Sequence, residues 1–218
     1  KPNSIILEPF GRNTAPAIAL AAIKASEYSK DPTLLILSSD HYIENNKSFR
    51  KAIEEGLNES NNNKIVTFGV KPLRPDTGYG YIEAYQNISK EHKSSKIKNF
   101  IEKPNLDKAK KLFKEENIFW NSGIFLVKAS TIIEELKKFE PELFNICYES
   151  FEKGKKDLDF FRIDKQSFSK CPNIPIDIAV MEKTDLGYVF LLETGWISTD
   201  FAENFAEGAK IIIDDDKA

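Results

Sequence analysis

The sequence is poor in the residues that build metal centres and disulfide scaffolds. It contains two cysteines, Cys147 and Cys171, and two histidines, His41 and His92. Two isolated histidines cannot make a His-rich metal site, and two cysteines without metal-ligand spacing do not make a disulfide framework. We therefore expect two unreactive thiols in a chain that resides in the reducing cytoplasm.

Long apolar runs and an excess of positive charge are also missing. No run approaches the roughly 20 apolar residues that cross a bilayer, and no signal peptide is visible. The formal net charge is -3 and the lysines are interleaved with glutamates, so no face is obviously basic. These absences argue against nucleic acid and membranes as partners. The hydrophobic share of 41% can still build the core of one domain.

What the sequence does contain is an alternation of strand-like and helix-like segments. The continuous apolar run at residues 34–37 is typical of a parallel strand covered on both faces. The alternation predicts a three-layer, Rossmann-like α/β domain with a mixed, mostly parallel sheet. We expect residues 157–172 to be irregular. A buried strand is predicted at residues 5–7. Further strands are predicted at residues 65–70, 80–85, 97–102, 124–127 and 188–192, and helices at 15–29, 48–57, 106–116, 131–139, 142–152 and 176–183.

Two of the predicted strands are followed by polar residues that suit phosphate chemistry. Asp40 comes directly after the strand at 34–37, where a carboxylate is well placed to hold Mg²⁺. An Asp at this position could equally cap the next turn. Glu8, Asn13 and Thr14 lie before the first predicted helix, whose N-terminal amides suit a phosphate or a polar base edge. Simple N-capping by Asn13 or Thr14 is the alternative.

A second group of polar residues suits a sugar phosphate. Gly80 allows a ligand to approach the backbone closely, although a turn into a strand also uses a glycine. Glu102 could accept hydroxyl hydrogen bonds and Lys103 could neutralise a phosphate, or the two could form a surface ion pair of little energetic value. Asn121, expected in a turn before the strand at 124–127, could bind a sugar hydroxyl through both its donor and its acceptor.

Taken in this order, these segments resemble one family. The chain is similar to the nucleotidyltransferase domain of the mannose-1-phosphate guanylyltransferases, also called GDP-mannose pyrophosphorylases. The Gly-Arg-Asn-Thr-Ala-Pro run and the Ile-Asp-Ile-Ala-Val-Met-Glu-Lys run are more specific to this branch than Glu-Lys-Pro. The resemblance extends to about residue 196, and its segments lie at residues 8–22, 39–41, 68–69, 75–82, 100–104, 120–123 and 176–183.

The resemblance implies a fold and a reaction. The fold would be the GT-A-like type of the sugar nucleotidyltransferases, and the reaction would convert GTP and mannose 1-phosphate into GDP-mannose and pyrophosphate. Asp40 would be a catalytic Mg²⁺ ligand, and Lys103 would face the sugar phosphate. By the same resemblance, Glu8, Asn13 and Thr14 would lie near the guanine nucleotide, and Gly80, Glu102 and Asn121 would contact mannose. A homo-oligomer is possible.

Two departures from the family pattern set further expectations. The family's Gly-rich loop ending in Arg-Leu-Trp-Pro is not in these 218 residues. We therefore expect a single partial domain over residues 1–218 that lacks the first strands, with residues 197–218 as a divergent tail. Ser198 stands where the family has a second Mg²⁺-ligating Asp, and Asp200 is the nearest substitute.

These departures leave three functional hypotheses. The first is a mannose-1-phosphate guanylyltransferase, here in an incomplete, weakly active or inactive form. The second is a nucleotidyltransferase for another sugar phosphate or nucleotide. The third is a non-catalytic module that binds a sugar nucleotide or serves in assembly.

Overall fold

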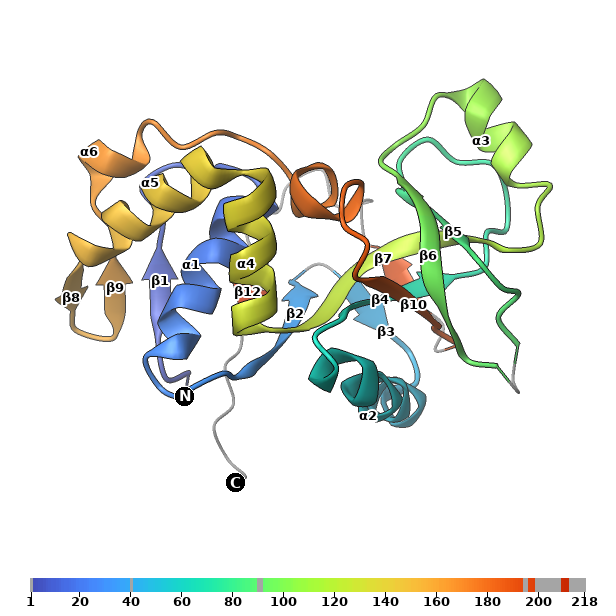
Figure 1. The fold of residues 1–218 in the computed structure, drawn as a ribbon, viewed down its shortest axis with the longest axis horizontal. Helices are drawn as coiled ribbons and strands as arrows, with labels where there is room; N and C mark the ends of the chain where they lie inside the picture. Colours follow the sequence, from blue (N-terminus) through green and yellow to red (C-terminus); the bar gives the residue numbers. More distant parts are fainter. Residues whose placement is uncertain (1, 40, 90–91, 194–195, 199–208, 212–218) are drawn as a thin grey trace.

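The chain folds as an α/β domain in which strands and helices alternate along most of the sequence (Figure 1). The structure is a computed structural model, and it describes residues 2–39, 41–89, 92–193, 196–198 and 209–211. The strands are β1 (Ile5–Leu7), β2 (Thr33–Ser38), β3 (His41–Ile43), β4 (Ile65–Val70), β5 (Tyr81–Ala84), β6 (Ser94–Ile101), β7 (Ile118–Lys128), β8 (Lys155–Asp157), β9 (Phe160–Arg162), β10 (Gly187–Leu191), β11 (Trp196–Ser198) and β12 (Ala209–Ile211). The helices are α1 (Thr14–Ser26), α2 (Asn46–Asn61), α3 (Leu106–Leu112), α4 (Ala129–Phe139), α5 (Pro141–Glu152), α6 (Lys165–Phe168) and the π-helix η1 (Asp177–Met181).

The main sheet has seven strands in the order β12-β2-β7-β4-β10-β6-β5. Strand β7 also pairs with β5, so β7, β4, β10, β6 and β5 close into a ring. The length of β7, 11 residues, makes this closure possible. Its first residues pair with β5, and its last residues pair with β2.

The prediction of a mixed sheet is confirmed, but the prediction that it is mostly parallel is wrong. Of the pairings between described strands in this sheet, β4 with β10 is parallel and the others are antiparallel. Strands β2 and β4, which α2 connects, do run in the same direction. Strand β7 lies between them and is antiparallel to both, so the helical connection does not join hydrogen-bonded neighbours.

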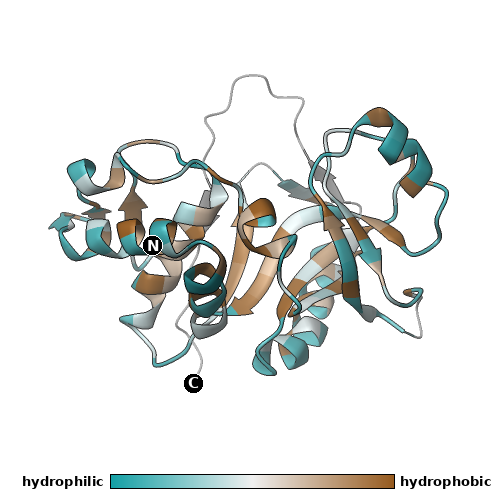
Figure 2. Ribbon diagram, turned by 45° about the horizontal axis from the view of Figure 1, so that its top comes forward, coloured by the Kyte–Doolittle hydropathy of each residue, from teal (hydrophilic) through white to brown (hydrophobic). Residues whose placement is uncertain are grey.

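Helices cover both faces of the sheet, and side chains on β7 alternate between the two cores. Phe125 and Val127 belong to the larger core, which includes residues of α1, α4 and α5. Ile124 and Leu126 belong to a second core beneath α2. In Figure 2 the central strands are mostly hydrophobic, whereas the helices carry both hydrophilic and hydrophobic residues. The period-2 alternation of a strand therefore sorts apolar residues onto two helical layers. No helix within the described ranges is long and apolar enough to span a bilayer.

Three local predictions need correction. Strand β2 is not parallel to its neighbour, because it pairs antiparallel with β7. It is covered on both faces as predicted: Leu34 and Ile36 belong to the larger core, and the half-buried Leu35 and Leu37 pack against the second core. Strand β1 was expected to be buried, but it is half-exposed and pairs with β9 outside the main sheet. Residues 157–172 were expected to be irregular, but the end of β8, all of β9 and helix α6 lie within them. Short elements of three or four residues are too brief for periodicity to reveal.

The closed ring makes Phe119 a sensitive test of the packing. Its side chain is fully buried on β7 opposite Ile82 of β5. We expect Phe119→Ala to lower the free energy of unfolding in urea by about 3–5 kcal/mol, because the lost ring leaves a cavity. Phe113→Ala, at a residue with 39% exposure, is the matched control and should cost less than about 1 kcal/mol. If both variants lowered the free energy of unfolding equally, the side chain of Phe119 would not be part of a packed core at the strand ring.

Candidate functional site

The site is built around an irregularity in the middle of β7. Asn121 and Gly123 were predicted to lie in a turn before a strand, and this is wrong, because both lie inside β7. The chain stays in the strand but is distorted, with Gly123 in the left-handed region at φ 71. The pairing register with β4 shifts between Thr67 and Gly69, next to this distortion. A β-bulge of this kind re-aims side chains within a sheet.

The re-aimed side chain is the carboxamide of Asn121. Its Oδ1 accepts hydrogen bonds from the Thr67 hydroxyl at 2.8 Å and from the Gly123 backbone N–H at 3.2 Å. Its Nδ2 donates to Asp177 Oδ1 at 2.8 Å. These bonds fix which end of the carboxamide is oxygen and which is nitrogen. One Nδ2 hydrogen goes to Asp177, and the other has no acceptor among the described residues.

Gly80 and Glu102 lie directly beside Asn121. The Gly80 carbonyl accepts a hydrogen bond from the Asn121 backbone N–H at 2.8 Å. A Cβ placed on Gly80 would come within 2.7 Å of Glu102 Oε2. The Glu102 carboxylate therefore occupies the space that a larger residue at position 80 would fill. The Glu102 backbone N–H donates to Glu182 Oε1 at 2.9 Å, which ties the end of β6 to the residue after η1.

Lys103 completes the outer side of this cluster. It follows β6 with a left-handed backbone at φ 40, an uncommon conformation for a lysine. Its Nζ lies 3.9 Å from Glu102 Oε1, and 63% of its side chain is exposed. The ammonium group is thus tethered near Glu102 while it still faces solvent. Backbone strain of this kind is concentrated at functional sites.

Two carboxylates in the cluster, Asp177 and Glu182, were not assigned by the sequence analysis. Burial, followed by the charge of Glu102, raises the pKa of Asp177 to about 7. Burial also raises the pKa of Glu102; the Lys103 charge opposes this shift and the Glu182 charge adds to it. The sequence signal was the motif at 176–183, which identifies a family but does not reveal that a π-helix brings its two acids beside Asn121.

The predicted nucleotide residues begin α1 and connect to the same π-helix. Asn13 occupies the N-cap at φ 67, and its Oδ1 accepts from the Thr14 backbone N–H at 3.0 Å. Thr14 is the first helical residue, and its hydroxyl accepts a hydrogen bond from the Ile176 N–H at 2.8 Å. The start of α1 is therefore bonded to the residue that precedes Asp177.

Glu8 differs from Asn13 and Thr14 in its surroundings. Its carboxyl is largely buried, and this burial raises its pKa to about 7. Glu8 Oε1 has no hydrogen-bond partner within the described part of the chain. A buried carboxyl of this kind is a candidate for a ligand contact or for acid–base work.

The predicted Mg²⁺ ligands, Asp40 and Asp200, lie outside the described residues. The described residues contain no group of three or more His, Cys, Asp or Glu side chains arranged to hold a metal ion. Next to Asp40, the ring of His41 reaches the distorted part of β7, because His41 Cε1 lies 3.6 Å from a Cβ placed on Gly123. The strand that follows Asp40 therefore runs close to Asn121.

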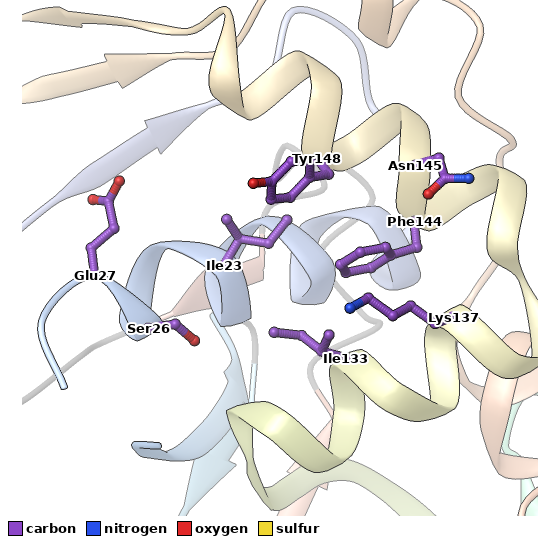
Figure 3. Close-up of a pocket in the computed structure, with 8 residues that line it drawn as sticks. All are labelled: Ile23, Ser26, Glu27, Ile133, Lys137, Phe144, Asn145 and Tyr148. Atoms are coloured by element: carbon purple, nitrogen blue, oxygen red, sulfur yellow. The ribbon is translucent and has the colours of Figure 1, made fainter. Parts of the chain in front are cut away.

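A separate hollow lies among α1, α4 and α5 (Figure 3). It has a volume of about 520 Å³, and the rings of Phe144 and Tyr148 lie on one side of it. None of the site residues predicted from sequence is among those that line it. The full lining consists of Ile23, Ser26, Glu27, Ile133, Lys137, Phe144, Asn145 and Tyr148.

Comparison with known proteins identifies the family. A family model described as nucleotidyl transferase matches residues 2–203. The chain belongs to the nucleotidyl transferase family. The alternation of strands and helices around a mixed sheet is thus an α/β nucleotidyltransferase fold.

Two relatives with similar sequences support membership in the nucleotidyl transferase family. The chain is 45% identical over 196 residues to the xanthan biosynthesis protein XanB of Xanthomonas campestris. This match covers 90% of the present chain and 41% of XanB. The chain is 44% identical over 196 residues to the mannose-1-phosphate guanylyltransferase RfbM of Salmonella typhimurium, covering 89% of this chain and 40% of that one. This nucleotidyl transferase thus spans about two fifths of the length of these relatives.

A solved structure agrees with the fold. The structure titled as mannose-6-phosphate isomerase from Helicobacter pylori matches with a TM-score of 0.81 at 32% identity. The match covers 88% of this chain and 74% of that chain.

The raised pKa of Asp177 predicts a pH dependence of stability. The folded state keeps this proton up to pH about 7, whereas an unfolded Asp releases it near pH 3.9. The stabilisation from Asp177 is therefore complete below pH about 4 and is lost as the pH rises to about 7. Asp177→Asn keeps the oxygen that accepts from Asn121 and removes the charge. We expect the free energy of unfolding of the variant, minus that of the unsubstituted chain, to rise by up to about 4 kcal/mol from pH 4 to pH 7.

Urea unfolding of both proteins at a series of pH values measures this difference. The pKa of Glu8 is also about 7, but Glu8 is present in both proteins, so its contribution cancels in the difference. Parallel stability curves for the two proteins between pH 4 and pH 8 would contradict the raised pKa of Asp177.

Proposed function

We propose that these residues form the sugar-phosphate part of a mannose-1-phosphate guanylyltransferase, which converts GTP and mannose 1-phosphate into GDP-mannose and pyrophosphate. The observation that carries the proposal is the oriented carboxamide of Asn121 beside the Glu102 carboxylate and the exposed Lys103 ammonium. The identity of 44% to a protein named mannose-1-phosphate guanylyltransferase favours this reaction over another sugar phosphate or a non-catalytic module.

In this proposal the cluster binds the sugar through complementary donors and acceptors. The remaining Nδ2 hydrogen of Asn121 donates to one hydroxyl of mannose, and the Glu102 carboxylate accepts from another. Gly80 is needed because any side chain there displaces Glu102. Asp177 does not contact the sugar in this proposal; it holds the Asn121 carboxamide in the orientation that presents its N–H group.

Lys103 has a different part, which follows from its charge and exposure. Its ammonium binds the sugar phosphate and orients a phosphate oxygen for in-line attack on the α-phosphorus of GTP. Positioning and neutralisation of charge are the main sources of rate acceleration in phosphoryl chemistry. We place Glu8, Asn13 and Thr14 beside the guanine nucleotide. Support for this placement comes from their position at the start of α1 and from the bond between Thr14 and Ile176.

The proposal includes Mg²⁺, which would neutralise the negative charge of the triphosphate. Asp40 is the proposed ligand, and Asp200 is the proposed second ligand. Support for Asp40 is its oxygen chemistry and its position beside His41, whose ring lies near the distorted part of β7. Further parts of the proposal are a GT-A-like type of fold and a cytoplasmic location.

Nucleotide preference tests the reaction. Pyrophosphate release is measured with the chain, Mg²⁺ and mannose 1-phosphate in the presence of GTP, UTP or dTTP. We expect GTP to give the fastest release and GDP-mannose as the product. The absolute rate of turnover is a separate result of the same assay. Preference for UTP or dTTP would contradict the guanylyl assignment.

Binding of the sugar phosphate tests the role of Lys103. In isothermal titration with mannose 1-phosphate, Lys103→Ala should raise the Kd about 10- to 100-fold, since a hydrogen bond to a charged group contributes about 1.5–3 kcal/mol. Lys110→Ala, which removes an exposed lysine from the last turn of α3, is the control of equal charge and should stay within about twofold. An unchanged Kd for Lys103→Ala would refute a phosphate contact by this residue.

A further inference from the structure

The fold brings the two cysteines of the chain into contact. Cys147 lies on α5 and Cys171 follows α6, 24 residues later, yet their sulfur atoms are 3.8 Å apart. Both residues are buried and both thiols are free. Two unreactive thiols were predicted, because two cysteines without metal-ligand spacing make neither a metal site nor a disulfide framework. A separation of 24 residues does not indicate that the two sulfurs meet. Contact between two thiols is the geometry from which a disulfide can form.

We propose that Cys147 and Cys171 are an oxidisable pair, which a peroxide-class oxidant converts into an intramolecular disulfide between α5 and the turn after α6. This inference is independent of the proposed function, because it uses no residue of the Asn121 cluster and no substrate.

The two thiols differ in reactivity. The hydrogen bond between the two thiols lowers the pKa of Cys171; burial and the charge of Glu8 oppose this shift, and the positive charge of Arg12 assists it. The same hydrogen bond, followed by burial, raises the pKa of Cys147. The thiolate is the nucleophilic form of cysteine. Arg12, whose Nη2 bonds the Ser169 carbonyl two residues before Cys171, places its positive charge on the Cys171 side of the pair. We therefore assign Cys171 as the sulfur that attacks the oxidant and Cys147 as the one that resolves the product.

Cys171 lies in a segment whose neighbouring residues are at the surface. Its own exposure is 2%, but Ser169 and Lys170 before it and Asn173 after it are exposed. The side chain of Arg12 covers the same turn, where its Nη2 donates to the Ser169 carbonyl at 2.7 Å. A disulfide would therefore fix the turn on which the loop before α1 rests.

The reaction balances in two steps. The Cys171 thiolate attacks one oxygen of hydrogen peroxide, an S–O bond forms, the O–O bond breaks, and the leaving hydroxide takes up the former thiol proton to become water. The Cys147 sulfur then attacks Cys171, the S–S bond forms and the S–O bond breaks. The departing hydroxide takes the Cys147 proton as the second water. Two thiols lose two electrons and two protons, and one peroxide is reduced to two waters.

The test treats the folded chain with hydrogen peroxide, then unfolds it in the presence of a thiol-alkylating reagent and maps the peptides by mass spectrometry without reduction. We expect both thiols to be protected from alkylation and the Cys147 and Cys171 peptides to be linked, with a mass lower by two hydrogen atoms. The matched control is the same chain oxidised in urea, where the linked product should form at least about tenfold more slowly because the fold no longer holds the sulfurs together.

Two variants separate the roles of the sulfurs. Cys147→Ala should accumulate a sulfenic acid at Cys171 that a 1,3-diketone reagent labels, whereas Cys171→Ala should leave Cys147 at least about tenfold less labelled. Both thiols still open to alkylation after peroxide, or linkage as fast in urea as in the folded chain, would overturn the proposal. Equal labelling of the two variants would overturn the assignment of Cys171 as the attacking sulfur. If a variant does not fold, the proposal is tested by the unsubstituted chain alone, through the rates of disulfide formation in the folded state and in urea.

Discussion

The hydrogen-bonded carboxamide of Asn121 is the interaction on which the candidate site depends. It links Thr67 on β4, Gly123 on β7 and Asp177 on η1, while the Asn121 backbone N–H reaches the Gly80 carbonyl. A buried carboxamide without partners costs about 1–3 kcal/mol, so the distortion of β7 persists because it satisfies this group. The strand ring and the π-helix are thereby held in one arrangement, and the remaining N–H of Asn121 is directed by the protein before any ligand binds.

The same region gathers negative charge at a cost in stability. Glu102, Asp177 and Glu182 lie close together, and burial raises the pKa of both Glu102 and Asp177. Such a cluster is unfavourable for a structural core but suits a ligand that brings many hydroxyl donors. The positive charge of Lys103 lies at the exposed side, where a phosphate can approach it. The separation of carboxylates inside from ammonium outside matches a sugar that enters with its phosphate toward solvent.

Local sequence patterns predicted most of the longer elements, with small errors at their ends. The helices α1, α2, α4 and α5 and the strands β4, β5, β6 and β10 lie where periodicity and apolar runs place them. Among the site residues, Gly80, Glu102, Lys103 and Asn121 were named from residue type and are brought together. The turn at Asn121, the parallel setting of β2 and the buried setting of β1 were wrong, because each depends on which strand becomes the neighbour.

Side-chain type and short-range order were enough to predict the family, the apolar segments that build the cores, and the residues whose chemistry suits a sugar phosphate. Three further features could be seen only in the folded chain: β7 is inserted antiparallel between β2 and β4, Asp177 orients Asn121, and Cys147 meets Cys171. Each of these is a contact between residues far apart in the sequence. Such contacts follow from how sheets and helices pack together, and no local pattern records them.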